Sequence, residues 1–311
     1  MAPLNLKRCL YRVFVIIYRG VGLTTCHIRG YEGIKMSDKI DIKVIIATHK
    51  TYRMPEDELY LPLHVGAEGK TDAEGKPLDL GYQKDNTGEN ISELNPLFCE
   101  LTGLYWAWKN LDADYVGLAH YRRHFMGKGK GKDLFDKVLR EKEVRFLINK
   151  GYKVIVPKRR DYFIESLYSH YVHTYGPEEI DETRRVISDL YPEYLPSFDT
   201  VASSRSGFMF NMMIVPKELL ADYCEWLFKI LFELDKRVDT TGWSDFRKRY
   251  LGRISEIIFN VWLDKKVKDG MVKAEEIAEI PFIYMEKVNK FKKGTAFLKA
   301  KFFHKGYEKS F

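Results

Sequence analysis

The chain has 311 residues, of which 45% are hydrophobic and 31% are charged, and its formal net charge is +7. This composition excludes a disordered or fibrous protein, and the length allows one large domain or two modest ones with a sizeable core. The basic excess is compatible with nucleic acid, an anionic membrane or an anionic substrate as partner, and charge alone does not choose among them.

The cysteine pattern and the hydropathy indicate in which cellular compartment the protein is expected. Cys9, Cys26, Cys99 and Cys224 lie far apart and form no C-x-x-C pair, so neither a zinc site nor a disulfide framework is expected, and a reducing cytoplasm is the default. No apolar run reaches the ~18 to 20 residues of a membrane span. We therefore expect a cytoplasmic chain without an inserted segment.

Residues 1–35 precede a second plausible translation start, at Met36. Residues 36–47, from Met36 onward, resemble an ordinary cytosolic N-terminus that enters its first strand. The hypothesis is that translation begins at Met36 and that residues 1–35 are a non-native extension, since Arg12 interrupts the apolar stretch that a signal peptide would need. The alternative is a basic amphipathic membrane anchor.

The first half of the chain predicts alternating strands and helices. The β-branched run at residues 43–48 predicts a buried parallel strand with a functional loop at Thr48 and His49. Residues 66–88 are rich in Gly, Asp and Lys and predict a long loop. Asn95 before a proline predicts a helix N-cap, with the helix over about 96–110.

The rest of the chain continues this alternation. The expected strands are residues 115–119, 154–156 and 208–215, the last of them central in the sheet. The expected helical regions are residues 162–195, 218–234 and about 245–264. Strands that alternate with helices favour an α/β sheet.

The stretch from residue 114 to 124 is the most informative, because an apolar strand runs directly into His120, Arg122 and Arg123. In open α/β sheets ligands collect outside the carboxyl ends of the strands. Arginine pairs bidentately with phosphate oxygens and stays charged, so these residues predict a site for a nucleotide diphosphate. Arg205, in the loop before residue 208, is a candidate third cation. The alternative for each arginine is a solvated surface charge.

Two patterns suggest metal ligands and are set aside. Asp112 and Asp114 form an Asp-x-Asp, which many nucleotide-sugar transferases use to hold Mn²⁺ or Mg²⁺, but here it precedes its strand, at the opposite end from the arginines. No metal is expected, and fixed cations could stabilise a diphosphate leaving group instead. His170 and His173 form an H-x-x-H on an expected helix without a nearby carboxylate or cysteine, so they are interpreted as ordinary helix residues and assigned no role.

Several blocks fall in one order and spacing: residues 85–92, Asn95, 99–102, 105–106, 108–110, Gly117 and 120–123. Together they resemble the capsular and exopolysaccharide glycosyltransferases first catalogued as domain-of-unknown-function family 4422. The resemblance extends over about residues 42–265, and its His-Tyr-Arg-Arg block is the most specific part. It implies a single GT-A-like nucleotide-sugar transferase domain over residues 36–285, with a mostly parallel Rossmann-like sheet flanked by helices and a helical C-terminal part.

The resemblance also implies an activity. Members of that family include galactofuranosyltransferases, which use UDP-galactofuranose and invert the anomeric centre. By this resemblance the donor is a UDP-sugar, no cofactor is tightly bound, and the residues beside the first strand should line the donor pocket. These residues are Asp85, Asn86, Asn90, Ser92 and Asn95. Plain loop and capping chemistry is their alternative interpretation.

The last helix supplies a candidate base. Its Gly-Arg-Ile-Ser-Glu segment at residues 252–256 is similar to a late segment of the family. Ile254, Ile257, Ile258 and Val261 share one helical face, which places Glu256 on the opposite face with Arg249, Arg253 and Asn260. An inverting transferase needs a carboxylate to take the acceptor proton, so Glu256 is the candidate and Asp245 the runner-up. A solvated helix face is the alternative.

Residues 286–311 form a basic aromatic tail with eight lysines. Such a tail can lie on an anionic membrane, or it can pack on the domain with its lysines solvated. The expected function is an inverting glycosyltransferase at the inner face of the plasma membrane, which adds one sugar of a capsule, exopolysaccharide or O-antigen repeat to a lipid-linked oligosaccharide. The alternatives are a nucleic-acid-binding protein, although no recognised motif supports a nucleic-acid partner, and a non-catalytic sugar-binding component of a polysaccharide assembly complex.

Overall fold

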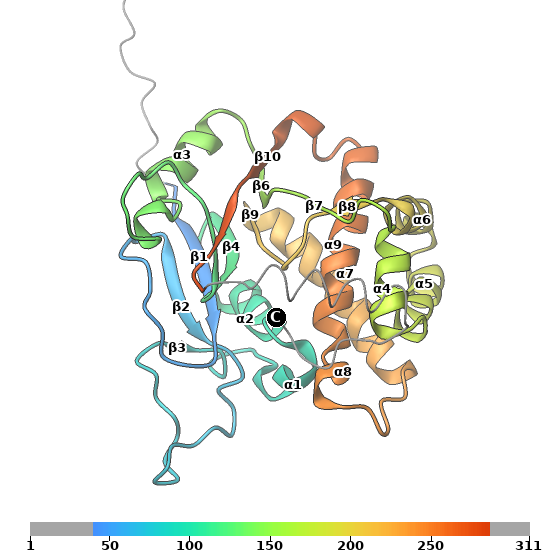
Figure 1. Cartoon of the computed structure of the whole chain (residues 1–311), viewed down its shortest axis with the longest axis horizontal. Coiled ribbons are helices and arrows are strands. Elements are labelled where there is room, and N and C mark those ends of the chain that lie inside the picture. Colours follow the sequence, from blue (N-terminus) through green and yellow to red (C-terminus); the bar gives the residue numbers. More distant parts are fainter. Residues whose placement is uncertain (1–39, 287–311) are drawn as a thin grey trace, which may run out of the picture. The chain divides into compact units, whose positions relative to one another are not determined.

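The computed structural model describes residues 40–286 (Figure 1). The predicted extension at residues 1–35, the proposed start at Met36 and residues 287–311 of the basic tail lie outside the described residues. The predictions about both ends therefore stay predictions.

A central sheet organises the described part of the chain (Figure 1). Its main row has the order β10-β6-β9-β4-β1-β2-β3. The bounds are β1 Ile42–Thr48, β2 Tyr60–His64, β3 Gln83–Lys84, β4 Tyr115–His120, β6 Val154–Pro157, β9 Met213–Pro216 and β10 Ile277–Ile280. Every strand in this row runs in the same direction except β9, which is antiparallel to both β4 and β6. The expected mostly parallel α/β sheet is confirmed.

Four short strands complete the pairing. Strands β5 (Arg123–Phe125) and β11 (Phe282–Tyr284) pair with each other, and β5 also pairs with β4. Strands β7 (Arg160–Asp161) and β8 (Ser206–Gly207) form a separate antiparallel pair. This second pair lies beside the helical part of the molecule (Figure 1).

The two predicted strands at the centre of the sheet are both present. Strand β1 is apolar along most of its length, and its side chains from Val44 to Ala47 are buried, as expected for a parallel strand covered on both faces. Val44 pairs with Gly117 of β4. A Cβ atom at Gly117 would lie 2.7 Å from the carbonyl oxygen of Met213, so glycine allows β9 to lie close to β4.

Helices pack against this sheet and form the C-terminal half. Helix α2 contacts β1 and α7, and α7 contacts β4 and β9. Helices α5 and α6 contact α9, and α4 contacts α5 and α6. The helices are α1 Asn95–Phe98, α2 Leu101–Asn110, α3 Glu141–Asn149, α4 Leu167–Tyr175, α5 Glu178–Leu190, α6 Leu195–Ser203, α7 Lys217–Arg237, α8 Asp245–Lys248 and α9 Tyr250–Lys268. Short 3-10 turns are η1 Ser92–Leu94, η2 Phe135–Lys137, η3 Pro192–Tyr194 and η4 Ala274–Glu276.

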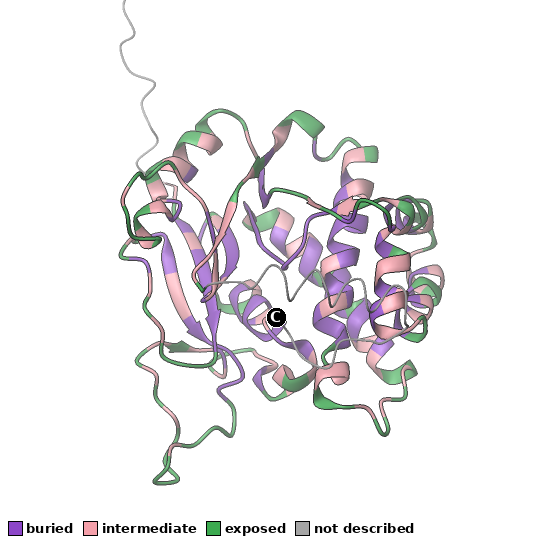
Figure 2. Cartoon of the chain, viewed as in Figure 1, coloured by how far each residue is buried: buried purple, intermediate pink, exposed green. Residues whose placement is uncertain are grey.

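The core continues from the sheet into the helices. The strands at the centre of the sheet and the inner sides of α7 and α9 are buried, whereas the outer helix faces are exposed (Figure 2). Tyr223 of α7 and Trp262 of α9 are fully buried, with ring centroids 5.0 Å apart. The Trp262 indole N–H donates to Asp222 at 2.7 Å, so its polar atom is satisfied.

The predicted helix at 96–110 is two helices. Cys99, with φ 54°, separates α1 from α2. Asn95 does not cap the helix through its side chain: its amide donates to the Cys99 carbonyl at 2.7 Å and to Thr102 Oγ1 at 3.1 Å. These bonds bridge the break. The predicted last helix is likewise divided, into α8 and α9, at Arg249.

The predicted strand at residues 208–215 is mostly wrong. Only β9, from Met213, pairs in the sheet, and Phe210 and Asn211 have φ angles of 75° and 54°. The side chain of Asn260 accepts from the Phe208 N–H at 2.7 Å and donates to its carbonyl at 2.8 Å. An apolar segment can therefore be buried as a loop, because a side chain satisfies its backbone.

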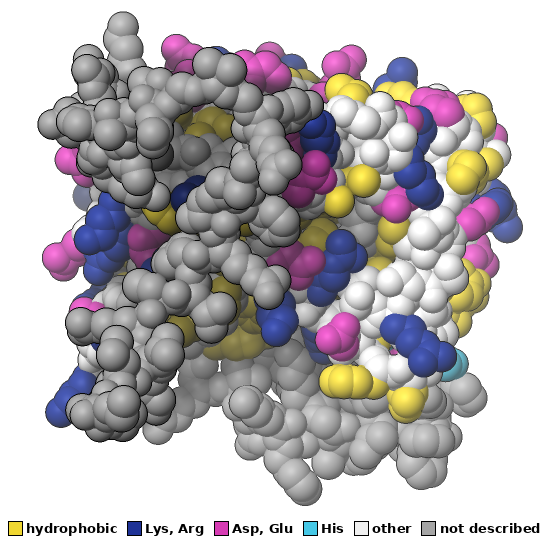
Figure 3. Space-filling model, turned by 90° about the horizontal axis from the view of Figure 1, so that it is seen from above, with side chains coloured by type: hydrophobic (Ala, Val, Ile, Leu, Met, Phe, Trp, Pro, Cys, Tyr) yellow, Lys and Arg dark blue, Asp and Glu magenta, His cyan; other side chains and the backbone are white. Residues whose placement is uncertain are grey.

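One face of the molecule shows mixed charge where the described residues are visible (Figure 3). Figure 3 shows one face, on which the visible Lys and Arg side chains lie among Asp and Glu side chains rather than in one basic patch. Within residues 40–286, every helix is too short or too polar to cross a bilayer.

Candidate active site

A cavity of about 900 Å³ lies at the carboxyl ends of β1, β2 and β4, between the sheet and helices α4, α8 and α9. The sheet wall of this cavity is formed by the last residues of strands and by residues that follow strand ends. These residues include Ala47, His49, His64, Val65, Gly66 and the run from His120 to Arg123. The helical wall is formed by Leu167, His170, Tyr171, Tyr175, Asp245, Phe246, Lys248, Arg249, Gly252, Arg253, Glu256 and Ile257.

The cavity carries more positive than negative side chains. Seven Lys and Arg side chains line it, against three Asp and Glu. The basic residues are Lys70, Arg122, Arg123, Arg160, Lys248, Arg249 and Arg253, and the acidic ones are Glu100, Asp245 and Glu256. This balance favours an anionic ligand.

The end of β4 places both predicted arginines at the cavity. The Arg123 guanidinium lies 4.2 Å from the Phe210 ring centroid, and its buried Nε has no hydrogen-bond partner in the part of the chain that is described. An Arg122 nitrogen lies 3.6 Å from a carboxylate oxygen of Glu286. A buried donor without a partner is costly, so Arg123 is suited to a ligand that brings an acceptor.

His120 contributes in a different way from the arginines. Its Nε2 donates to the Phe210 carbonyl at 2.5 Å, and burial lowers the pKa of the ring. The neutral imidazole therefore holds the Phe210 loop at the cavity. The positive charge at the end of β4 comes from Arg122 and Arg123.

Asp85 lies behind the cavity wall rather than in it. Its carboxylate is fully buried and accepts from the N–H groups of Gly66 and Ala67 at 2.8 and 3.1 Å, and from the Ser92 and Thr102 hydroxyls. Gly66 lines the cavity with φ +66°, and a Cβ there would lie 2.5 Å from the Asn95 side chain. Asp85 thus shapes the loop that carries Gly66, and it is not among the residues that line the cavity, although it was predicted to line the donor pocket.

Most other predicted donor-pocket residues also act on loop geometry. Thr48 is buried and its hydroxyl donates to the Lys50 carbonyl at 2.7 Å. Asn86 donates to Glu68, and Asn90 accepts from the Ser92 N–H at 3.1 Å. None of these, nor Ser92, is among the residues that line the cavity. The sequence could not separate them from cavity residues, because Asn and Ser serve turns and ligands alike.

His49 and Asn95 are the predicted residues of this region that do line the cavity. The His49 ring packs edge-on against Tyr121, with centroids 5.3 Å apart. Partial burial, followed by the charges of Lys50 and Arg122, lowers the pKa of His49. It presents a neutral ring at neutral pH.

Arg205 is not at the cavity. Its side chain is exposed and donates to the Phe163 carbonyl at 3.3 Å, and its own carbonyl accepts from the Tyr162 N–H at 2.8 Å. Arg205 therefore holds the β7–α4 loop, away from the cavity at which it was predicted to supply a third cation.

Glu256 lines the cavity, on the α9 face predicted for it. Burial, and next the negative charge of Glu100, raise the pKa of Glu256 to about 7. Arg253 lines the cavity from α9 and Arg249 from the residue before it, whereas Asn260 is buried and binds the Phe208 backbone. A carboxyl group with a pKa near neutrality can accept a proton from an attacking hydroxyl and release it afterwards.

Glu100 is a cavity residue that the sequence did not single out. Its Oε1 accepts from the Asn211 amide at 2.8 Å, and Asn211 also donates to the Gly252 carbonyl and accepts from the Ser255 hydroxyl. Asn211 thereby ties the Glu100 carboxylate to α9. In the sequence, the one sign of this contact was a polar residue, Asn211, inside the apolar run at residues 208–215.

The runner-up base, Asp245, also lines the cavity. It is the first residue of α8, after the N-cap Ser244, and it is exposed. Its carboxylate is open to solvent, whereas burial raises the pKa of Glu256. The geometry favours Glu256 over Asp245.

The Asp-x-Asp lies away from the cavity, at the amino end of β4 as expected. Asp112 is 97% exposed in its side chain and pairs with Lys217 at 2.6 Å, and Asp114 accepts from the Asp41 N–H at 2.8 Å. Between residues 40 and 286, no cluster of three or more His, Cys, Asp or Glu side chains is arranged to hold a metal ion.

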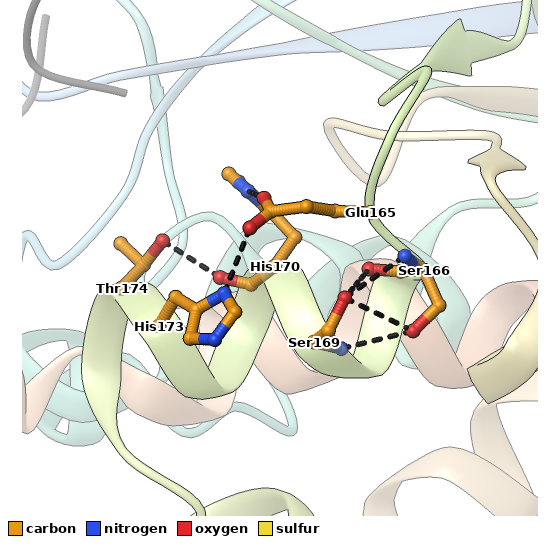
Figure 4. Close-up of polar contacts among 6 residues, drawn as sticks. All are labelled: Glu165, Ser166, Ser169, His170, His173 and Thr174. Carbon is orange, nitrogen blue, oxygen red and sulfur yellow. Dashed lines mark hydrogen bonds and ion pairs between the residues drawn. The ribbon is translucent and has the colours of Figure 1, made fainter. Parts of the chain in front are cut away.

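The two histidines that were assigned no role do have a carboxylate beside them. Glu165, only 3% exposed, lies between them and accepts from His170 Nδ1 at 3.0 Å and from His173 Nδ1 at 2.7 Å (Figure 4). The sequence interpretation overlooked Glu165 because it precedes the helix instead of sharing its face. His170 lines the cavity, whereas His173 is not among the lining residues.

The sequence profile of a family described as a domain of unknown function, DUF4422, matches residues 43–267. The chain belongs to this family. The match spans the sheet except for the first residue of β1 and strands β10 and β11, and it includes nearly all of α9, so both walls of the cavity lie within the DUF4422 region. The family predicted from the order of the motifs is confirmed.

The DUF4422 chain is also similar to one solved structure, described as the apo structure of the WbbM bifunctional glycosyltransferase. The two share 28% sequence identity with a TM-score of 0.71, over 79% of this chain and 46% of that one. The chain thus spans less than half the length of WbbM. No protein with a curated function matches it.

Proposed function

We propose that the chain is an inverting glycosyltransferase that transfers galactofuranose or another hexose from a UDP-sugar to a lipid-linked oligosaccharide, in capsule, exopolysaccharide or O-antigen synthesis. Membership of the DUF4422 family and similarity to a bifunctional glycosyltransferase support a transferase. The observation that carries the proposal is one cavity with two arginines at a strand end and a carboxyl group of raised pKa on the opposite helical wall.

The UDP-sugar binds at the sheet wall. Arg122 and Arg123 pair with the diphosphate, and the buried Arg123 Nε gains the acceptor that it lacks. His49 and Asn95 contact the nucleoside from the ends of the neighbouring elements. Asp85 keeps the Gly66 backbone in place behind them.

Glu256 acts as the general base. The acceptor hydroxyl attacks the anomeric carbon, its proton passes to the Glu256 carboxylate, and the bond between the anomeric carbon and the UDP oxygen breaks. Attack on the face opposite to the leaving group inverts the anomeric centre. The arginines stabilise the negative charge that develops on UDP, which is the role a divalent metal plays in many related transferases.

A lipid-linked acceptor implies that the enzyme works at a membrane surface. The β7–α4 loop exposes Phe163 and Ile164, with relative exposures of 78% and 59%, directly after Tyr162, which lines the cavity. Arg205 donates to the carbonyl of Phe163 in this loop, and Arg159 directly precedes β7. Exposed apolar side chains beside cations suit the surface of an anionic bilayer.

The test is UDP release by the purified protein from UDP-galactofuranose, UDP-galactose, UDP-glucose and UDP-N-acetylhexosamines, in EDTA and in Mn²⁺, with membrane lipid extract as acceptor. Acceptor-dependent release in EDTA is expected. Release that needs Mn²⁺ contradicts the role given to the arginines, and absence of release from every donor contradicts the proposed activity.

A further inference from the structure

Arg249 lies where two helix breaks meet at the cavity. It separates α8 from α9, with a φ of −75° and a ψ of 21°, and Cys99, with a φ of 54°, separates α1 from α2. The Arg249 Nε donates to the Cys99 sulfur at 3.1 Å, and a Cβ atom at Gly252 would lie 3.2 Å from the same sulfur. The start of α9 is therefore packed closely against the α1–α2 break, and the Cys99 thiol orients the Arg249 guanidinium.

Most of the hydrogen-bonding capacity of Arg249 is unused. A guanidinium carries five N–H groups, and a thiol sulfur is a weak acceptor for one of them. Within residues 40–286, the bond to Cys99 is the only hydrogen bond of the Arg249 side chain, and no carboxylate forms an ion pair with it. The residue is exposed and lines the cavity. Its two terminal nitrogens are therefore available to a ligand.

Arg253, one turn further along α9, provides the contrast. Its two terminal nitrogens donate to the carbonyls of Phe246 and Arg247 at 2.9 and 2.7 Å, and its guanidinium lies 4.2 Å from the Tyr175 ring centroid. These bonds tie α8 to α9. Arg253 thus serves the helical wall itself, whereas Arg249 offers its charge to the cavity.

The charge of Arg249 reaches the sheet wall. Burial lowers the pKa of His49, and the charges of Lys50, Arg122 and Arg249 lower it further. The His49 ring packs against the Tyr121 ring, and the Arg122 guanidinium lies 5.3 Å from the Tyr121 ring centroid. Guanidinium groups from the sheet wall and from the helical wall therefore act on the same small region of the cavity.

A diphosphate is the chemical group that this arrangement suits. It presents oxygens on two phosphorus atoms, and each phosphate group can accept paired N–H bonds from a planar guanidinium. Arg122 and Arg123 reach such an anion from one wall only. When UDP leaves a sugar it gains negative charge, and a fixed cation on the opposite wall stabilises that charge without rearrangement.

We propose that Arg249 is the third cation of the diphosphate site. Its terminal nitrogens bind the diphosphate from the helical wall, Arg122 and Arg123 bind it from the sheet wall, and Cys99 is a positioning residue that holds the Arg249 Nε. Arg249 takes the role that the sequence assigned to Arg205. The identification of the anion as UDP rests on the proposed function, whereas the binding of a diphosphate between the two walls does not.

The test measures the binding of inorganic pyrophosphate and UDP to the whole chain by calorimetry, and of uridine by ligand-observed NMR. Arg249→Gln is expected to raise the dissociation constants of pyrophosphate and UDP about 10- to 100-fold, because charge-assisted hydrogen bonds are lost. Uridine carries no phosphate, so its dissociation constant should change less than about twofold. Unchanged uridine binding also shows that the cavity is still folded.

Two matched variants separate a direct contact from a general loss of charge. Lys248→Gln removes a cation from the adjacent position, which also lines the cavity, and should weaken pyrophosphate binding less than about threefold, because solvent screens a charge that makes no contact. Arg249→Lys keeps the charge but loses the planar fork, so its dissociation constant should lie between those of the wild type and Arg249→Gln.

The role of Cys99 has its own readout. Cys99→Ala removes the acceptor of the Arg249 Nε and should weaken pyrophosphate binding about threefold while uridine binding is unchanged. Cys99→Ser restores an acceptor and should recover the affinity. With ¹⁵N-labelled arginine, the Nε signal that is missing in Arg249→Gln should move when pyrophosphate is added to the wild type.

Three results overturn the third cation: the wild type binds neither pyrophosphate nor UDP, Arg249→Gln and Lys248→Gln weaken pyrophosphate binding equally, or Arg249→Gln weakens uridine binding as much as UDP binding. The assay requires no turnover, so it separates the two proposals. A chain that binds pyrophosphate through Arg249 yet releases no UDP from any donor keeps this site and loses the transferase proposal. Sugar transfer by a wild type whose diphosphate affinity is unaltered in Arg249→Gln removes only the role of Arg249.

Discussion

The two walls of the cavity are built in different ways. The sheet wall consists of short runs that follow strand ends, such as His120 to Arg123 after β4, and its charge comes from residues adjacent in sequence. The helical wall combines α4, α8 and α9, and its chemistry comes from pairs distant in sequence, such as Glu256 with Glu100. A strand end places charges by itself, whereas a tuned pKa depends on which groups the fold brings together.

The largest effect is expected from the sheet wall. Arg122→Ala with Arg123→Ala should lower kcat/KM by about 10³-fold or more, because both cations that stabilise the leaving diphosphate are lost. UDP release from the best donor measures it. Arg122→Lys with Arg123→Lys is the matched control, which keeps the charge but loses the planar fork and should recover part of the activity. Full activity in the alanine variant would refute the role of this wall.

The helical wall is tested at its carboxylates. Glu256→Gln should lower kcat by about 10² to 10³-fold with little change in donor KM, since it removes the base without altering size. Asp245→Asn, on the same wall but exposed, should lower it less than about tenfold. If Asp245→Asn lowers kcat more than Glu256→Gln does, Asp245 is the base.

Glu256→Gln, which is expected to lower kcat, is also expected to raise the unfolding temperature at high pH. The folded-state pKa of Glu256, about 7, lies above its ordinary value, so its charged form destabilises the fold as the pH rises through 7. Glu256→Gln should therefore unfold at a higher temperature than the wild type at pH 8 and at the same temperature at pH 4.

Asp85→Asn tests whether the sheet wall depends on the hydrogen bonds that the buried Asp85 carboxylate accepts. Asp85→Asn weakens the buried acceptor of four hydrogen bonds and should lower the free energy of unfolding by about 2 to 3 kcal/mol. Donor KM should rise because the Gly66 loop loses its anchor, while the pH profile of kcat keeps its position. Denaturant unfolding and donor titration measure the two effects. Unchanged stability would show that the loop is held by other contacts.

The smallest effect is a shift of the pH profile. In the wild type kcat should fall as the pH drops below about 7, because Glu256 becomes protonated. Glu100→Gln removes the charge that helps to raise the pKa of Glu256 and keeps an oxygen for Asn211, so the acidic limb should move to lower pH. If the acidic limb of the kcat profile stays at the same pH in Glu100→Gln, burial alone raises the pKa of Glu256.

Local patterns in the sequence were sufficient for the framework. The buried strands β1 and β4, the parallel sheet, the family and the position of Arg122 and Arg123 at a strand end all followed from hydrophobic runs and motif order. The α9 face that carries Glu256 followed from helical periodicity, because the apolar stripe determines which face turns inward. These features depend on neighbours within a few residues.

What only the tertiary structure decided depends on contacts between distant segments. The helix breaks at Cys99 because the side chains of Asn95 and Thr102 donate to the Cys99 carbonyl at the break. Residues 208–212 form a buried loop because Asn260 binds the Phe208 backbone and the Asn211 side chain binds the Gly252 carbonyl. Asp85 proved to be a support, and Glu165 a partner for both histidines, only when their neighbours were placed. Polar side chains serve loops, caps and ligands with the same atoms, so their roles are fixed by the groups that folding brings within hydrogen-bond distance.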